Sequence, residues 1–298
     1  MIKEIIDNKQ WDDEISKSED CTFYQSSNNR GLCEFNGEKT YCIKYQGEES
    51  KILAMVAVYP SFISIPFGPI IYGKQDEKEL LNFLNIVRRK FRLPVKFCLF
   101  NEKIDNYSWI QNNARNVWNF TTALLNVDSD IDTIKARFNQ NRRRIIRKAL
   151  VNLKDSIISM DKNNAELFYK MYSERLYTTH GEVDFTSNEL LNMLRNENVN
   201  LYMCILNSKP IAGIVTFKFN DTLITRYNCT DTKYLSLNPN SYLDYYLINK
   251  GIKDPNLKYY DFSGISEETS NETKLKNIDR YKYSYGPNLI KKYNWYMF

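Results

Sequence analysis

His180 is the only histidine of the chain, and it stands two residues before Glu182 and four before Asp184. Imidazole has an ordinary pKa near neutral pH, so His180 is a candidate general base for catalysis. Glu182 and Asp184 are alternative candidates, either as bases or as groups that bind a substrate. A lone histidine is more often incidental than catalytic, so both interpretations of His180 stay open.

The same residue counts argue against a metal centre and against a disulfide framework. One histidine cannot form a site built from several imidazoles, although carboxylates and thiols stay available as ligands. No two cysteines have the CxxC spacing of a zinc cluster, and a chain of this length can form its core without disulfides. We therefore expect no metal, reduced thiols and a cytoplasmic location. The cysteines are Cys21, Cys33, Cys42, Cys98, Cys204 and Cys229.

The segment 230–250 combines a polar loop with a predicted helix. The helix begins near Ser241, and the first turn of a helix has free backbone N–H groups and a positive dipole end. This arrangement suits a pyrophosphate, and Lys233 in the loop adds a positive charge. The alternative is that Asn240 or Ser241 only caps the helix. The predicted donor-binding residues in this segment are Lys233, Asn238, Asn240 and Ser241.

Two predicted strands of the second half also carry polar side chains. Alternation along 223–229 places Ile224, Arg226 and Asn228 on one face. Because arginine binds phosphate through two N–H groups, we predict that Arg226 binds substrate and Asn228 binds the cofactor. A solvated face is the alternative. Asp261 ends a later strand, where it either takes a proton from an amine or serves as a structural carboxylate.

The composition is typical of a soluble globular protein. The 298 residues are enough for one large domain or two of ordinary size, and 43% of them are hydrophobic and 26% charged. A formal net charge of +5 suits an anionic small ligand without requiring nucleic acid. No apolar run approaches the about 20 residues of a membrane span, and the N-terminus is too charged for a signal peptide.

The periodicity of apolar residues predicts two similar halves. In the first half it predicts strands at 39–45, 52–65, 95–100 and 121–127 and a helix at 75–91. In the second half it predicts the order β-α-α-β-β-β-α-β-α-β. The strands of that half are expected at 156–160, 201–205, 211–219, 223–229, 258–262 and toward 295, and the helices at 164–178, 187–196, 241–250 and 272–283.

A single basic helix at 130–151 separates the halves. Asp130 is its expected cap, and Ile134 and Phe138 belong to its apolar stripe. The opposite face is either solvated or binds a nucleic acid or nucleotide phosphate. The predicted domains are 1–128, the linker helix 129–152, and 153–298. The residues assigned to the basic face are Arg137, Arg142, Arg143, Arg144, Arg147 and Lys148.

Four segments of the second half resemble the FemAB-like proteins, and they occur in the family order. Residues 141–149 are similar to the linker helix of that family, with its pattern RrnIrkA. Residues 237–243 are similar to the loop that opens the third helix of its C-terminal half. Residues 260–264 resemble the strand end fDfgG, and residues 281–286 resemble the segment fKxxFG. The resemblance covers most of the chain from residue 130 onward.

This resemblance implies an α/β (α+β) fold of two tandem GNAT-like domains, each a mixed central sheet flanked by helices. Lys282 stands where FemAB-like proteins have a lysine that supports the charge of the donor phosphate or of the leaving group. The loop with His180 is expected to border the acceptor site, and Tyr285 to bind substrate or to pack in the core. The usual GNAT pyrophosphate motif, Q/R-x-x-G-x-G/A, is absent, and residues 238–241 stand in its place. The predicted catalytic residues are His180, Asp261 and Lys282.

A compact FemAB-like chain without a helical arm resembles the CoA-dependent sugar N-acyltransferases of the FdhC kind. Those enzymes acylate the amine of a nucleotide-linked amino-deoxysugar in bacterial surface polysaccharide synthesis. The resemblance therefore implies acyl-CoA and a nucleotide sugar as substrates, with direct attack of the amine on the thioester. The alternative is a FemAB-type transferase that moves an amino acid from tRNA to a peptidoglycan precursor. The missing arm and the modest charge count against that alternative.

Overall fold

The computed structural model describes residues 2–74, 76–100, 110, 113–180, 183–265 and 273–298, and the chain forms two compact units. Unit 1 is Met1–Thr122 together with Ile290–Phe298, and unit 2 is Ala123–Leu289. This division differs from the predicted domains. The basic helical region belongs to unit 2, and the end of the chain belongs to unit 1 because Lys292–Met297 pair with Val95–Phe100.

Unit 1 is built on a mixed sheet. Its strand order is β1-β2-β3-β4-β6-β13, and β5 pairs with β3. Strands β4 and β6 run parallel, whereas β2 and β3 form a long antiparallel pair. Its elements are β1 (Ile2–Glu4), α1 (Asn8–Ile15), the 3-10 helix η1 (Phe23–Gln25), α2 (Ser27–Phe35), β2 (Lys39–Gln46), β3 (Ser50–Val58), β4 (Ile63–Ile65), β5 (Ile70–Gly73), α3 (Glu77–Phe91), β6 (Val95–Phe100), β7 (Arg115–Asn126, which continues into unit 2) and β13 (Asn288–Met297).

Helix α3 confirms the helix predicted at 75–91. Its apolar residues recur at intervals of three and four, so they form one stripe along the helix. That stripe is buried in the core of unit 1, where it meets strand residues that include Trp295 from the end of the chain. Sequence periodicity predicted no element before residue 39, where α1 and α2 lie. The buried residues of α3 are Leu80, Phe83, Leu84 and Val87.

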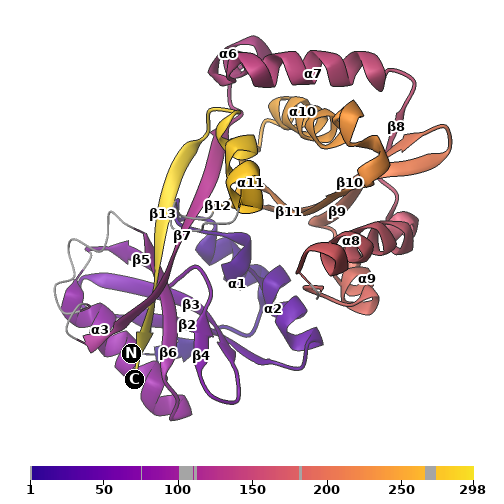
Figure 1. Ribbon diagram of the computed structural model, residues 1–298. Helices are drawn as coiled ribbons and strands as arrows, with labels where there is room; N and C mark the ends of the chain where they lie inside the picture. The colour runs from indigo at the N-terminus through magenta and orange to yellow at the C-terminus, as the bar shows by residue number, and fades with distance from the viewer. Residues whose placement is uncertain (1, 75, 101–109, 111–112, 181–182, 266–272) are drawn as a thin grey trace. The chain divides into compact units, whose positions relative to one another are not determined.

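From residue 156 onward the elements follow the order that the sequence predicted, and all of them except the last strand, β13, belong to unit 2. Its sheet order is β12-β11-β10-β9-β8, with all neighbours antiparallel except β11 and β12. Helix α10 covers one face of this sheet, and α8 and α9 cover the other (Figure 1). The elements are α6 (Ile131–Arg137), α7 (Gln140–Asn152), β8 (Ile157–Ser159), η2 (Lys162–Asn164), α8 (Ala165–His180), α9 (Ser187–Arg195), β9 (Val199–Leu206), β10 (Lys209–Phe219), β11 (Thr222–Thr230), η3 (Thr232–Leu237), α10 (Pro239–Ile252), β12 (Tyr259–Ile265) and α11 (Thr273–Tyr283).

The predicted basic helix is two helices, α6 and α7, which pack as part of unit 2. The chain leaves the helical path at Phe138, and Asn139 starts the second helix by accepting a hydrogen bond from the N–H of Arg142 at 2.7 Å. Ile134, Phe138 and Ile146 are buried in the core of unit 2. Helix α7 lies along α10 (Figure 1). Because the apolar residues of α6 and α7 are buried, these two helices are an integral part of unit 2.

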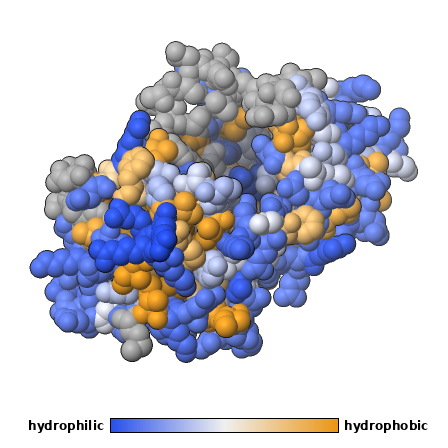
Figure 2. Space-filling view, turned by 90° about the horizontal axis from the view of Figure 1, so that it is seen from below, coloured by the Kyte–Doolittle hydropathy of each residue, from blue (hydrophilic) through white to orange (hydrophobic). Residues whose placement is uncertain are grey.

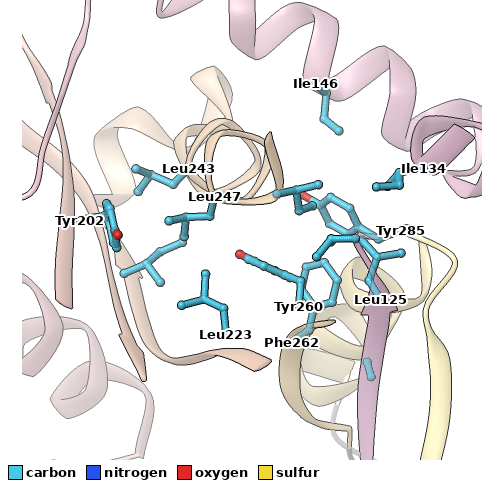
Figure 3. Packing of buried hydrophobic residues seen from close by; sticks show 14 of the residues in the cluster. Leu125, Ile134, Ile146, Tyr202, Leu223, Leu243, Leu247, Tyr260, Phe262 and Tyr285 are labelled. Carbon is cyan, nitrogen blue, oxygen red and sulfur yellow. The ribbon is translucent and has the colours of Figure 1, made fainter. Parts of the chain in front are cut away.

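The core of unit 2 lies between α10 and the sheet. Leu243 and Leu247 of α10 lie near Tyr202 and Leu223 of the sheet, and Tyr260 and Phe262 of β12 belong to the same core (Figure 3). On the surface shown in Figure 2, hydrophilic side chains predominate and hydrophobic ones form separate groups. Within the described residues, no helix has the length and apolar character needed to cross a membrane.

Candidate active site

The two parallel strands of unit 2 separate soon after they meet. Their backbone pairing joins Thr222–Ile224 to Tyr259–Asp261. The next contacts use side chains, because Thr225 Oγ1 donates to the carbonyl of Asp261 at 3.1 Å and Ser263 Oγ donates to the carbonyl of Thr225 at 2.6 Å. Ser263 has a φ of 62°, which turns β12 out of the extended conformation. The carboxyl ends of such strands are where α/β proteins place ligands.

Strand β11 has a β-bulge at Arg226, next to the point where its backbone pairing with β12 ends. Thr225 pairs with Thr216 of β10, whereas Tyr227 pairs with Val215, so Arg226 is the extra residue of the bulge. The predicted simple alternation along 223–229 is therefore wrong. Asn228 shares the α10 face of the sheet with Thr225, and a bulge frees backbone groups from the ladder. Both Arg226 and Asn228 have exposed side chains.

Helix α10 begins beside these strand ends with an open N-terminus. Its first flanking residue, Asn238, has left-handed φ and ψ of 58° and 49°, and its side chain makes no capping hydrogen bond. Instead Asn238 donates to the carbonyl of Ser236 at 3.1 Å. Pro239 is the first helical residue, and the first turn has no acidic side chain. The free N–H groups and the dipole of this turn therefore favour an anion.

The other residues predicted to bind a donor near this helix end differ in which of their polar groups are available to an anion. Lys233 is exposed in η3, and its N–H bonds Asp231 at 3.0 Å. Ser241 is only 2% exposed, and its hydroxyl accepts a hydrogen bond from Arg142 at 2.6 Å. That hydroxyl is already engaged in the interior, so only the backbone N–H of Ser241 is left for an anion. Asn240 Oδ1 is buried without a hydrogen-bond partner among the described residues.

Lys282 reaches the carboxyl end of β12 from helix α11. Its Nζ donates a hydrogen bond to the carbonyl of Gly264. Burial lowers the pKa of Lys282 to about 8 by disfavouring the charged form. The charges of Asp261, Asp279 and Asp244 act in the opposite direction, and that of Arg226 acts with burial. An amine with this pKa exchanges a proton near neutral pH, as a catalytic acid or base must.

Asp261 lies within electrostatic reach of Lys282 but has a structural contact of its own. Its carboxylate accepts the N–H of Ser263 at 2.7 Å and so supports the turn of β12. The side chain is half-buried rather than enclosed. Asp261 therefore has the structural function that the sequence left as one alternative, at a position where a proton acceptor would also serve.

A buried polar cluster beneath α10 was not foreseen from the sequence. Asp244 is 4% exposed and accepts hydrogen bonds from Tyr260 at 2.6 Å, from Tyr281, and from Tyr285 at 3.5 Å. Burial raises the pKa of Asp244, whereas Tyr260, Tyr281 and the Arg142 charge oppose that shift. The hydroxyl groups of Tyr260 and Tyr285 point toward α10 (Figure 3). Tyr285 is 0% exposed and packs in the core, which is the second of the two alternatives that the sequence left open for it.

Arg142 closes this cluster from helix α7, and its placement corrects the predicted solvated face. It is 4% exposed and donates to Ser284 Oγ at 2.7 Å and to Ser241 Oγ at 2.6 Å. Its guanidinium also stacks over the rings of Tyr281 and Tyr285, at 4.1 and 4.6 Å from the centroids. The sequence contained a signal for this, because position 142 is four residues from both Phe138 and Ile146 on the apolar stripe.

Asp184, which was predicted near an acceptor, lies on the opposite face of the sheet from α10. Asp184 is exposed and accepts the hydroxyl of Tyr172 at 2.6 Å. Tyr172 and Phe185 pack with Tyr227 of β11. Glu182 and the side chain of His180 lie outside the described residues. Among the described residues, no three His, Cys, Asp or Glu side chains gather as metal ligands.

Comparison with known proteins supports this fold and extends it to the whole chain. Residues 140–283 match the family model described as "Acetyltransferase (GNAT) domain". The solved structure "Crystal structure of FemX" has a TM-score of 0.80 at 10% identity and covers 99% of this chain and 96% of that chain. No curated protein matches this chain.

Two further solved structures share the fold at lower similarity. The C-terminal domain of a putative lysylphosphatidylglycerol synthetase from Agrobacterium fabrum has a TM-score of 0.59 at 9% identity, covering 97% of this chain and 92% of that chain. A tandem GNAT protein from the clavulanic acid biosynthesis pathway, solved without AcCoA, has a TM-score of 0.56 at 7% identity, covering 99% and 97%.

Residues 140–283 thus resemble the fold of a GNAT domain, and this match covers slightly less than half of the chain. The chain as a whole has the two-domain, FemAB-like form of that fold, as the sequence predicted.

Proposed function

We propose that this chain is a FemAB-type aminoacyltransferase, which moves an amino acid from its ester on tRNA to an amine of a peptidoglycan precursor. The similarity to FemX along nearly the full length of both chains carries this proposal. The absent helical arm no longer argues against it. Because the match covers 96% of the FemX chain, that chain has no room for an additional long arm.

The names of the other similar structures also bear on the donor. A lysylphosphatidylglycerol synthetase is named for a product that carries a lysyl group, which is an aminoacyl group. The exposed face of α7 supports an RNA donor as well. The helix contains no acidic residue, and its exposed cations suit a phosphate backbone. These cations are Arg143, Arg144, Arg147 and Lys148.

The proposed chemistry is a direct transfer. The neutral amine of the acceptor attacks the ester carbonyl, a C–N bond forms, and the bond from the carbonyl carbon to the ribose oxygen breaks. Lys282 donates a proton to the leaving oxygen, which is a much stronger base than a thiolate and gains more from an acid. Asp261, through water, takes the proton that the amine loses. The first turn of α10 holds a phosphate near the reacting ester.

A second function, the acylation of a nucleotide-linked amino-deoxysugar by acyl-CoA as in the FdhC kind, is supported by one observation. A tandem GNAT protein with the same fold is described by reference to AcCoA. The open N-terminus of α10 suits the pyrophosphate of CoA as well as a phosphate of RNA. In that case Lys282 would protonate a thiolate, which is a weaker base than the ribose oxygen and gains less from an acid.

The test supplies both kinds of donor to the purified full chain. Transfer of a radiolabelled amino acid from aminoacyl-tRNA to a peptidoglycan precursor is expected, together with no thiol release from acyl-CoA in the presence of amino sugars. The opposite result would replace the first function by the second. Lys282→Met is expected to lower the turnover rate about 10²- to 10⁴-fold. Lys276→Met, an exposed lysine on the same helix, is the matched control and should keep the wild-type rate.

A further inference from the structure

The catalytic proposal leaves the buried cluster around Arg142 and Asp244 without a role. Five elements or segments contribute to it, although its two charged groups come from helices α7 and α10. A buried charge is costly unless it is paired or hydrogen-bonded, so such a cluster is seldom a neutral part of a core. Its members are Arg142 of α7, Ser241 and Asp244 of α10, Tyr260 of β12, Tyr281 of α11, and Ser284 and Tyr285 just after α11.

The two charged groups contact the same two tyrosines from different sides. Arg142 stacks on the ring faces of Tyr281 and Tyr285, and Asp244 accepts the hydroxyl groups of both. The N–H groups of Arg142 also bridge Ser241 and Ser284. A guanidinium can make all these contacts at once because its donors lie in a rigid plane. Lysine at this position would keep the charge and lose the geometry.

These contacts determine the position of Lys282. Tyr281 immediately precedes Lys282, and Ser284 Oγ donates to the carbonyl of Tyr281 at 2.5 Å. The last turn of α11 is therefore held through the ring, the hydroxyl group and the backbone carbonyl of Tyr281. From this turn Lys282 extends to the carbonyl of Gly264.

We infer that Arg142 and Asp244 are positioning residues, which hold the last turn of α11 against the first turn of α10 and so keep Lys282 at the end of β12. This inference rests on the proposed function only for its kinetic consequence. The placement of Lys282 itself is a property of the folded chain. Misplacing a catalytic group by about 1 Å can lower a rate about 10²-fold, so the cluster matters to catalysis without touching substrate.

The first experiment measures the titration of Lys282 directly and needs no substrate. Lysine labelled at Cε is observed by NMR in the full chain, and the spectrum of Lys282→Met assigns the signal. The charged groups facing Lys282 are Asp244 of α10, Asp261 of β12, Asp279 of α11 and Arg226 of β11. Because the Asp244 charge raises the pKa of Lys282, Asp244→Asn should move the midpoint to lower pH. An unchanged midpoint would overturn the inference, whether or not the chain transfers amino acids.

The second experiment separates positioning from folding. Arg142→Met should lower the turnover rate at saturating donor about 10²-fold, with Arg142→Lys between it and the wild type. Arg195→Met removes an exposed arginine from α9, on the other face of the sheet, and should keep the wild-type rate. Far-UV circular dichroism at the assay temperature shows that each variant is folded. A folded Arg142→Met with the same rate as Arg195→Met would contradict the inference. If the wild type shows no transfer, the proposed function fails, and the NMR result still decides the role of Asp244.

Discussion

Each unit contains a parallel strand pair with a helix between its two strands, and the two helices begin in opposite ways. In unit 1, α3 lies between β4 and β6, and Asp76 caps it by accepting the N–H of Lys78, with Glu77 and Glu79 in the first turn. In unit 2, α10 lies between β11 and β12 and begins without a side-chain cap or an acidic residue. An anion is repelled by the first helix end and attracted by the second.

The strand pairs beside these helices differ in the same sense. In unit 1, Gln25 lies within the sheet region, where its Oε1 accepts the N–H of Met55 at 2.8 Å and its Nε2 donates to the carbonyl of Pro66. The carbonyl of Gly68 accepts the N–H of Cys98 at 2.8 Å, so the contact between the strands continues. In unit 2 the backbone pairing of the strands ends at Asp261, and the next link between them is made by a side chain, Ser263 Oγ to the carbonyl of Thr225. The repeated fold therefore has one copy whose strand pair and helix start are closed and one copy in which both are more open, and the proposed donor site is in the more open copy.

The largest expected effect concerns the titration of the open copy. Lys282 has its pKa lowered to about 8, whereas the pKa of Lys74 in unit 1 is raised by Glu49. If protonated Lys282 is the acid, turnover is constant below that pKa and falls about tenfold per pH unit above it. The rate at saturating substrates, measured across this range, checks the sign. A rate that rises through pH 8 would instead assign Lys282 as a base.

The closed copy should depend on Gln25 for stability. Gln25→Leu leaves the N–H of Met55 and the carbonyl of Pro66 buried and unpaired, which costs about 3 kcal/mol in the free energy of unfolding. Urea unfolding followed by tryptophan fluorescence measures this, since Trp11 donates to the carbonyl of Gln25 at 2.7 Å. Gln10→Leu changes an exposed glutamine and should cost at most about 0.5 kcal/mol. Equal costs would mean that Gln25 does not hold the strands.

Making the open helix end resemble the closed one should weaken donor binding. Asn240→Asp adds a negative charge to the first turn of α10 and is expected to weaken an anionic donor by about 1 kcal/mol, or about fivefold in Kd. Titration with uncharged tRNA or CoA measures the effect. Glu77→Gln in the first turn of α3 should leave the Kd unchanged. Equal affinity of Asn240→Asp and the wild type would remove this helix end from the donor site.

The smallest expected effect compares the caps themselves. Asp76→Ala removes the side-chain cap of α3 and should cost about 1 kcal/mol of unfolding free energy. Asn238→Gly should change stability by only a few tenths, about 0.3 kcal/mol, because Asn238 makes no capping bond and glycine accepts its left-handed conformation. Thermal unfolding of both variants tests the difference. A large loss in Asn238→Gly would show that its side chain closes α10 after all.

Most of the fold of unit 2 was predictable because helix and strand periods are local properties of the chain. The β-α-α-β-β-β-α-β-α-β order follows from them, and the structure confirms it, although the last strand, β13, pairs with β6 of unit 1. The break between α6 and α7 was missed because the apolar stripe continues through Phe138, and only the Asn139 cap shows where the helix restarts. The bulge at Arg226 was missed because alternation along one strand does not show an extra residue relative to its partner.

The candidate site was predictable only in part. Lys282, Asp261 and the loop before α10 were found from motifs, and the structure brings them to one end of the same sheet. Arg142 was assigned to a basic face that is either solvated or binds a phosphate, and Asp244 was not considered. Both lie at helical spacing within apolar stripes, which is the local signature of a buried charge. Helical spacing does not show which residues pair with a buried charge, and those residues are far away in the sequence.

The sequence by itself determined the repeat, the element order of the second half, and the residue types near the strand ends, because each depends on neighbours along the chain. Only the tertiary structure decided which copy is open, which hydroxyl groups are engaged, and where Lys282 is held. Those properties depend on contacts such as Arg142 with Ser284, which lie 142 residues apart. A buried charge is stable only where such distant partners meet it, and folding alone brings them together.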